Sequence, residues 1–189
     1  GYLDLMYEHP DLFDKLMQVN EAFCVDWANA QLEAGATAIC YFDPLSSSTV
    51  LPREKFLKTG FEIGKRTISK INGPVALHLA SGISLPIADE LTKMGAAVLG
   101  VSGDEDLAEL KSTYFKKINL LGNLNGIEMR RWSAAEAELK VKEAIKKAAK
   151  GGGFILSDNH GEIPYQVTDE VLMAISNAVQ KWGNYPIKF

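Results

Sequence analysis

Two histidines are the residues in this sequence best suited to chemistry. His78 follows the apolar residues 75–77, and His160 lies just beyond a second apolar run, 153–156. An imidazole exchanges protons near neutral pH and is a common metal ligand, so a pair at equivalent strand ends indicates a functional site. A single histidine is more often structural, and His9, which stands at a helix start, is assigned to surface capping.

Acidic side chains accompany the two histidines at the strand ends. They are Asp43, Asp104, Asp158 and Glu162. Such carboxylates could complete a mixed nitrogen and oxygen zinc site with His78 and His160 as metal ligands, or orient the imidazoles for proton transfer. Asp43 and Asp104 also stand where caps of the following helices are expected, and that structural role stays open. The expected catalytic residues are Asp43, His78, Asp158 and His160.

Amide and hydroxyl groups at other strand ends suit the binding of a polar substrate. The expected substrate-binding residues are Ser81, Asn123, Asn125 and Glu162. For the two asparagines the alternative is an Asn-Gly turn, which has a backbone reason of its own. The glycines at 151–153 precede a strand and lack the GxGxxG order, so they are not interpreted as a phosphate-binding loop.

Five short apolar runs precede these polar segments. They cover residues 36–42, 74–79, 96–101, 118–121 and 153–156. Each is apolar at nearly every position, which is typical of parallel strands buried on both faces. Helical patterns follow one another between the runs, at 11–34, 52–70, 84–94, 104–115 and 133–150, with a last helix at 168–182. This alternation predicts a parallel sheet with helical crossovers.

The polar segments distinguish two parallel architectures. In a doubly wound sheet chemistry gathers at one switch point, whereas in a barrel every strand delivers residues to one mouth. Five polar strand ends favour the C-terminal five β/α units of a TIM-type (β/α)8 barrel, as one partial domain over residues 1–189. A closed barrel needs eight strands and about 250 residues. The first three strands are therefore expected to be absent, with strand edges and an apolar flank exposed.

Composition narrows the class of protein. The chain has 189 residues and a formal net charge of −4, so it lacks the basic surface that nucleic acid requires. The lysines of 140–150 fall at helical spacing and are interpreted as a solvated helix face. No apolar run reaches the ~18–20 residues of a membrane span, and a cytoplasmic protein is expected.

The cysteines and the first residues carry two further expectations. Cys24 and Cys40 lie in apolar patterns without CxxC spacing, so they are expected to be buried free thiols in a reducing compartment. The chain begins at Gly1 without an initiator methionine and opens on what is interpreted as a connecting segment. We therefore expect a truncated or processed product.

Several segments together resemble the uroporphyrinogen decarboxylase superfamily, which includes cobalamin-dependent methyltransferases of anaerobic microbes. The similar segments are 8–12, 31–36, 42–44 with 51–56, 77–82, 121–125 and 151–164. The resemblance implies a β/α barrel, and the Asp43-Pro44 loop is more similar to the methyltransferase branch. Zinc-bearing members of that branch carry His-x-Cys and Cys-Gly. Here His78 is retained, while Ala80 and His160 stand at the two cysteine positions.

The resemblance implies a corrinoid-linked methyltransferase that takes methyl groups from methylated amines or aryl methyl ethers. His78 and His160 would supply a Lewis acid, such as zinc, or a general acid. The corrinoid would be carried by a partner protein, and a missing N-terminal half or a second chain would complete the barrel. A decarboxylase is the first alternative, since His160-Gly161 is similar to true decarboxylases, although only Arg130 and Arg131 closely follow a strand-end loop. The loss of both family thiols supports a non-catalytic binding module instead.

Overall fold

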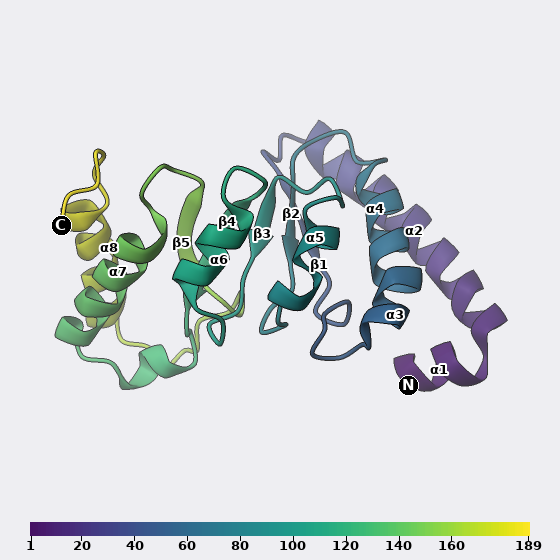
Figure 1. Cartoon of the computed structure of the whole chain (residues 1–189), viewed down its shortest axis with the longest axis horizontal. Coiled ribbons are helices and arrows are strands. Elements are labelled where there is room, and N and C mark those ends of the chain that lie inside the picture. The colour runs from purple at the N-terminus through teal and green to yellow at the C-terminus, as the bar shows by residue number, and fades with distance from the viewer.

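Five parallel strands form one sheet in a computed structural model that describes residues 1–189 (Figure 1). The strands are β1 (Ile39–Phe42), β2 (Val75–His78), β3 (Val98–Gly100), β4 (Asn119–Leu124) and β5 (Phe154–Asp158). They lie side by side in chain order, and every neighbouring pair is parallel. A doubly wound sheet changes direction at a switch point, so this order is that of a barrel wall. The predicted fold class is confirmed.

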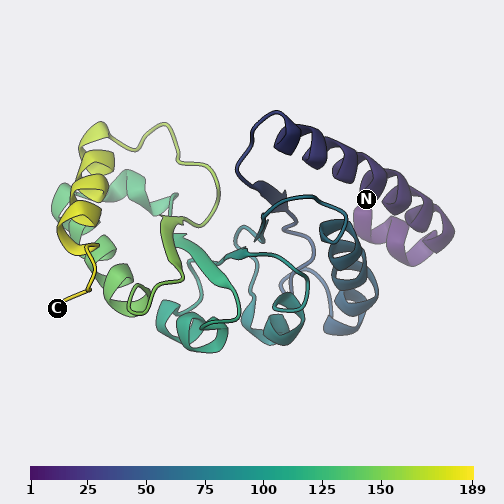
Figure 2. The same ribbon diagram turned by 90° about the horizontal axis from the view of Figure 1, so that it is seen from above.

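Helices alternate with the strands and lie along the outside of the curved sheet (Figure 2). They are α1 (Tyr2–Glu8), α2 (Pro10–Glu33), α3 (Arg53–Phe56), α4 (Glu62–Ile68), α5 (Ala88–Leu91), α6 (Leu107–Tyr114), α7 (Ala134–Ala148) and α8 (Asp169–Trp182). A π-helical turn, Leu57–Phe61, joins α3 to α4, and 3-10 turns cover Leu85–Ile87 and Glu128–Arg131. No helix combines the length and the hydropathy needed to cross a membrane.

Capping residues and a glycine in the sequence predicted the positions of several helix ends correctly. Ser133 caps α7, where its hydroxyl accepts a hydrogen bond from the Glu136 N–H and the Glu136 carboxylate accepts one from the Ser133 N–H. The Thr168 hydroxyl caps α8 in the same way. Gly35 follows α2 with a φ of +106°, a conformation that favours glycine. The lysines of α7 lie mostly on its exposed side, as expected.

Other element boundaries were wrong. The first residues form helix α1 and are not a connecting segment. Helix α6 begins only at Leu107, because the Asp106 carboxylate caps it by accepting from the Ala108 and Glu109 N–H groups, and Asp104 is left exposed. The helix expected at 84–94 is reduced to a 3-10 turn and the single turn α5. Strands β4 and β5 run beyond their predicted ends, to Leu124 and Asp158.

The main core lies between the sheet and its outer helices. Leu77, Leu99 and Leu120 are almost fully buried on the strands, and α6 and α7 contribute Leu110 and Val141 to the same core. Burial of apolar side chains of this size stabilises the fold by about 1.5–3 kcal/mol each. This layer fixes the strand positions and therefore the places at which the strand-end loops begin.

The other face of the sheet is more open at its first strand. Side chains alternate along a strand, so Cys40 and Phe42 point away from the helix layer that Ile39 and Tyr41 face. Phe42 is 58% exposed, and Cys40 is exposed as well. Cys24 is also exposed, on α2. The expectation that both thiols are buried is therefore wrong.

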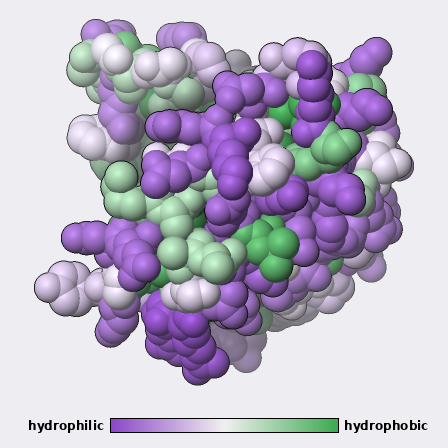
Figure 3. Space-filling model, turned by 90° about the vertical axis from the view of Figure 1, so that its left-hand side faces the viewer, coloured by the Kyte–Doolittle hydropathy of each residue, from purple (hydrophilic) through white to green (hydrophobic).

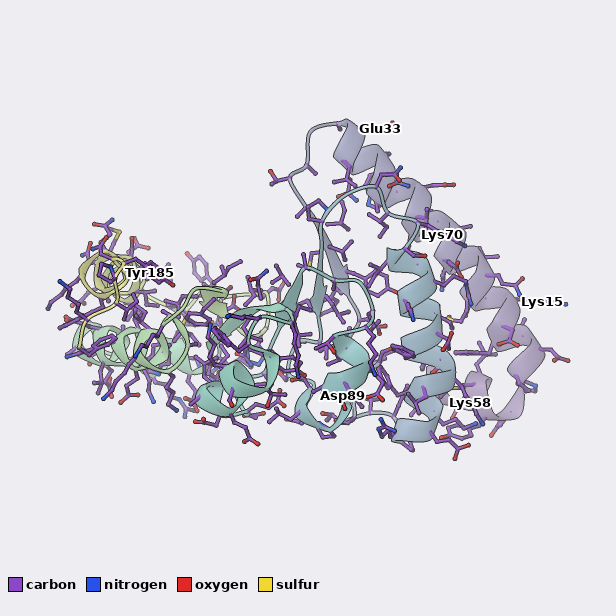
Figure 4. The ribbon with its side chains drawn as sticks, turned by 45° about the horizontal axis from the view of Figure 1, so that its top comes forward. Lys15, Glu33, Lys58, Lys70, Asp89 and Tyr185 are labelled. Atoms are coloured by element: carbon purple, nitrogen blue, oxygen red, sulfur yellow. The ribbon has the colours of Figure 1, made fainter.

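The apolar stripe of α2 is turned toward solvent. Its members are Leu12, Leu16, Val19, Phe23 and Trp27, and their side chains are between 41% and 67% exposed. The helix instead buries Phe13, Glu21 and Ala28, and Figure 4 shows it running beside α4 with Lys70 between them. The Lys70 ammonium donates to Glu21 at 2.6 Å. By contrast, the end of the molecule formed by α7 and α8 is mostly hydrophilic, with smaller hydrophobic groups (Figure 3).

Candidate functional site

His78, the last residue of β2, is held in one orientation. Only 7% of it is exposed, and its Nδ1 atom accepts a hydrogen bond of 2.9 Å from the Ala80 N–H. The ring lies beside Phe42, with ring centroids 5.6 Å apart. On the neighbouring strand, a Cβ atom added at Gly100 would lie 2.9 Å from His78 Cδ2. Glycine therefore leaves the space that the imidazole occupies.

The hydrogen bond to His78 depends on an unusual backbone conformation. Ala80 has a φ of +52°, in the left-handed region that costs a residue with a Cβ about 1 kcal/mol. In this conformation the Ala80 N–H points back toward the ring of His78. Because Nδ1 accepts that hydrogen bond, its lone pair is occupied. The neutral imidazole therefore carries its proton on Nε2.

His160 lies two residues beyond β5, in a turn built by Asp158. The Asp158 Oδ2 atom accepts hydrogen bonds from the N–H groups of His160 at 2.9 Å and Gly161 at 2.7 Å. This carboxylate thereby fixes where the loop presents the second imidazole. Gly126, in the loop after β4, packs against Asp158, since a Cβ at Gly126 would lie 3.5 Å from its carboxylate.

The Asn159 side chain sets the orientation of the His160 ring. Its amide oxygen accepts from the Gly103 N–H at 3.1 Å, and its amide nitrogen donates to the Leu124 carbonyl at 3.0 Å and to His160 Nδ1 at 2.8 Å. Both backbone partners have fixed polarity, so they determine which way the amide faces. His160 therefore also uses Nδ1 as an acceptor and carries its proton on Nε2.

Asp158 and His160 both act electrostatically on His78. Burial lowers the pKa of His78, the Asp158 carboxylate opposes that decrease, and the charge of His160 adds to it. These interactions require the three groups to lie at the same end of the sheet. The structure thus brings together His78, Asp158 and His160 from the predicted catalytic set.

Asp43 does not lie with the two imidazoles. It follows β1 by one residue and continues the alternation of Tyr41, which points toward the helices. It lines a separate cavity of about 410 Å³ that Tyr2 and Tyr41 also line. Burial raises the pKa of Asp43, although its carboxylate accepts a hydrogen bond from the Ser46 N–H at 3.1 Å. A role beside the histidines is not supported by this placement.

The four predicted substrate-binding residues fall into two groups. Asn123 donates to the carbonyl of Ser102 at 2.8 Å, and Asn125 accepts from two N–H groups that begin the following 3-10 turn. Both asparagines therefore have structural bonds within the loops. Ser81 is half-buried and Glu162 exposed, and neither side chain forms a hydrogen bond within the chain. These two remain available to a ligand.

An open hollow of about 620 Å³ adjoins His160. It is lined by Ile127, His160, Glu162, Ile163, Pro164 and Tyr165. The side chain of Tyr165 is fully exposed, and those of Ile127 and Ile163 are nearly half exposed. No lysine or arginine lines this hollow, so it suits a ligand that is uncharged and partly apolar.

The residues of this chain do not fit a zinc ion. No group of three or more histidine, cysteine, aspartate or glutamate side chains is placed to hold a metal. Zinc would also require an imidazole lone pair, yet Nδ1 of His78 and of His160 already accept hydrogen bonds. If zinc bound Nε2 of His78, the ring proton would have to move to Nδ1. That atom already faces the Ala80 N–H, and two donors would then oppose each other. No step is derived through zinc.

Three residues that shape the site were not predicted from the sequence. Ala80 and Asn159 orient the imidazoles, and Gly100 makes room for one of them. A glycine at a strand end can signal close approach of another group, so Gly100 was open to prediction. The left-handed conformation of Ala80 has no signal in residue type.

Most of the chain resembles known proteins of one family. Residues 1–182 match the family model described as uroporphyrinogen decarboxylase (URO-D). A uroporphyrinogen decarboxylase of Nitrosococcus oceani is 27% identical over 182 residues, which cover 94% of this chain and 50% of that protein. The methylcobamide:CoM methyltransferase MtaA of Methanosarcina barkeri is 24% identical over 157 residues, covering 82% and 44%.

The fold agrees with a solved structure of similar type. A methyltransferase from Methanosarcina mazei superposes with a TM-score of 0.85 at 20% identity, covering 97% of this chain and 53% of that one. The chain spans about half the length of the curated relatives it matches. Together with the parallel β/α order of the sheet, the family match establishes that this chain belongs to the uroporphyrinogen decarboxylase family.

Proposed function

We propose that this chain forms the mouth of a corrinoid-linked methyltransferase. The observation that carries the proposal is the apolar lining of the hollow at His160, which includes Ile127, Ile163 and Tyr165. Arg53 and Arg66 pair with Glu90 and Glu21, and the hollow at His160 contains neither arginine nor lysine. A decarboxylase would need cations to bind substrate carboxylates. The similarity to MtaA, named as a methylcobamide methyltransferase, supports the same choice.

In this proposal the chain binds a small methylated substrate and assists its leaving group. A reduced corrinoid, carried by a partner protein, supplies the nucleophile that accepts the methyl group. His78 and His160 donate hydrogen bonds from Nε2 to the group that departs, and Asp158 holds the loop of His160. Ser81 and Glu162 have free polar groups for the substrate. We place this reaction in the cytoplasm and in anaerobic metabolism, as the family resemblance implies.

We further propose that three more β/α units complete the barrel, from the same or a second chain. The exposed stripe of α2, residues 12–27, is an apolar surface that such units would cover. Five strands cannot close the barrel, and the matched relatives are about twice as long.

A carboxy-lyase is the second candidate. It is favoured by the 27% identity to a named uroporphyrinogen decarboxylase. The His160-Gly161 pair, which is similar to that of true decarboxylases, supports it as well.

One experiment on the full-length protein separates these functions. The protein is mixed anaerobically with chemically reduced cobalamin and a series of methylated amines and aryl methyl ethers. Methyl transfer is followed by the change in the cobalamin absorption spectrum. We expect transfer that is lost in His78→Ala and His160→Ala but kept in His9→Ala, the exposed control. Release of carbon dioxide from uroporphyrinogen without methyl transfer would support the carboxy-lyase, and neither reaction would indicate a binding module.

A further inference from the structure

We propose that a cavity at the amino end of the sheet binds the phosphate group of a small molecule. The cavity measures about 380 Å³, and its lining includes Lys111, Lys116, Lys117 and the glycines at 151–153. The loops before β4 and β5 form much of it, at the upper end of the sheet in Figure 1. It therefore lies at the end of the strands opposite to the two histidines, and the inference does not depend on the proposed function.

The lining of this cavity is positively charged and contains no carboxylate. No aspartate or glutamate lines it, and none of its three lysines forms an ion pair within the chain. Helices α6 and α7 end just before the two loops, and their carbonyl ends together contribute about one negative charge. Three ammonium groups exceed that charge. The cavity therefore attracts anions, although the chain as a whole has a net charge of −4.

The ring of Phe115 brings two of the ammonium groups close to each other. The Lys111 Nζ atom lies 5.0 Å and the Lys116 Nζ atom 5.5 Å from the centroid of this ring. The ring in turn packs against Gly151, where an added Cβ would lie 3.2 Å from two of its carbon atoms. Two cations beside one ring repel each other. A phosphate group that pairs with both would offset this repulsion.

Lys111 is the least exposed of the three cations. Its ammonium group donates to the Gly152 carbonyl, which leaves two N–H donors for a ligand. A side chain at Gly153 would begin 3.7 Å from the Lys111 Nζ atom, so glycine leaves this ammonium group accessible. Burial lowers the pKa of Lys111, because no anion of the chain compensates for the loss of surrounding water. A bound phosphate group would supply that compensation.

Lys116 occupies a position at which the backbone favours glycine. Phe115 and Lys116 have φ values of −53° and +60°, and the Lys117 N–H donates to the Tyr114 carbonyl at 2.9 Å. This is the pattern of a type II turn, whose third residue is usually glycine or asparagine. A lysine there strains the backbone, and such strain is typical of positions that bind a ligand. A ligand for the ammonium group therefore explains this residue better than the fold does.

Charge and size together indicate the class of ligand. A phosphate group on a small molecule carries about two negative charges near neutral pH and has three strong acceptor oxygens, which matches three ammonium donors. A carboxylate has a single charge and two oxygens. The cavity volume is within the range of small-molecule sites and leaves room for an organic part of the ligand. The glycines at 151–153 lack the GxGxxG order, so the lysine side chains supply the donors.

Calorimetric titration of the full-length protein tests the site with glycerol 3-phosphate, inorganic phosphate and uncharged glycerol at constant ionic strength. We expect glycerol 3-phosphate to bind saturably, and about tenfold more weakly in Lys111→Gln. Lys146→Gln is the matched control, because it removes the same charge from an exposed, unpaired lysine of α7 outside the cavity. Its affinity should stay within about twofold of the parent, since a distant surface charge is screened by salt.

A second variant separates binding from folding. Lys116→Gly relieves the left-handed strain, so its thermal midpoint should equal or exceed that of the parent while glycerol 3-phosphate binds about tenfold more weakly.

The outcomes decide the inference. Tighter binding of glycerol 3-phosphate than of inorganic phosphate would identify an ester as the ligand, and the reverse would identify the free ion. Equal weakening by Lys146→Gln and Lys111→Gln would reveal a general charge effect and overturn the site. Equal binding of glycerol, or no saturable binding of either phosphate at about 10 mM, would overturn it as well.

Discussion

Replacement of Gly100 by alanine should damage the site through a single added carbon. The new Cβ would lie 2.9 Å from Cδ2 and 3.0 Å from Cγ of His78. Carbon atoms in ordinary contact are about 3.5–4.0 Å apart, so the ring must move by roughly 0.5–1 Å. Phe42 limits movement on that face. The 2.9 Å bond from the Ala80 N–H would then stretch toward the limit of a hydrogen bond.

The expected size of the effect differs between stability and activity. Overpacking of this kind lowers the free energy of unfolding by about 1–3 kcal/mol. A catalytic group displaced by about 1 Å can slow a reaction by about a hundredfold. We therefore expect Gly100→Ala to fold but to transfer methyl groups about a hundredfold more slowly. Urea unfolding and the rate of cobalamin methylation, both on the full-length protein, measure the two effects.

Gly64→Ala is the matched control. Its added carbon would also meet a neighbour, but that neighbour is the terminal Cε of Met94, which can rotate away. Alanine also favours the helical conformation of α4 by up to about 1 kcal/mol. The control should keep its activity and lose little stability. A Gly100→Ala protein with parental activity and an unshifted His78 NMR signal would refute the packing argument.

Three further outcomes are expected on the full-length protein. Arg66 and then Lys70 lower the pKa of Glu21 to about 2 from its ordinary 4.5, so the stability this contributes is complete above about pH 4.5 and is lost as the pH falls toward 2. Because both cations are about half exposed, Glu21→Gln should lower the free energy of unfolding at pH 7 by about 1 kcal/mol at most, and urea unfolding measures the loss. Glu105→Gln should lower the unfolding free energy by about 1–3 kcal/mol, since the buried carboxylate accepts from the N–H and hydroxyl of Ser84, and thermal unfolding measures the loss. Because burial lowers the pKa of His78, the folded state resists its protonation, and stability should fall as the pH drops below about 6.5 in the parent but less in His78→Gln.

The sequence predicted the strands of the sheet better than it predicted which face of the sheet each side chain points to. Apolar runs identified all five strands, and the polar segments after them indicated the barrel order. Placing Asp43 with the histidines was less successful, because one position along a strand reverses the direction of the side chain. His78 points inward and Asp43 toward the helices, although His78 ends β2 and Asp43 directly follows β1.

The exposure of Cys40 and of the α2 stripe, and the proton position on His78, could not be predicted from the sequence for a different reason. Cys40 and the stripe of α2 have apolar patterns, yet no residue of this chain covers them. The donor state of His78 depends on the left-handed conformation of Ala80, which residue type does not reveal. Such features depend on tertiary contacts, and hydrophobic periodicity reports only the local element.

The sequential order of the strands has a consequence for how the protein assembles. Each strand finds its neighbour across a single helical connection, so these pairings restrict little chain and can form early. The seam that closes a barrel joins strands far apart along the polypeptide and should form last. For the same reason it should open first under mild denaturation. The arrangement of strand-end residues around the barrel mouth would then be lost, while most of the helical circular-dichroism signal persists.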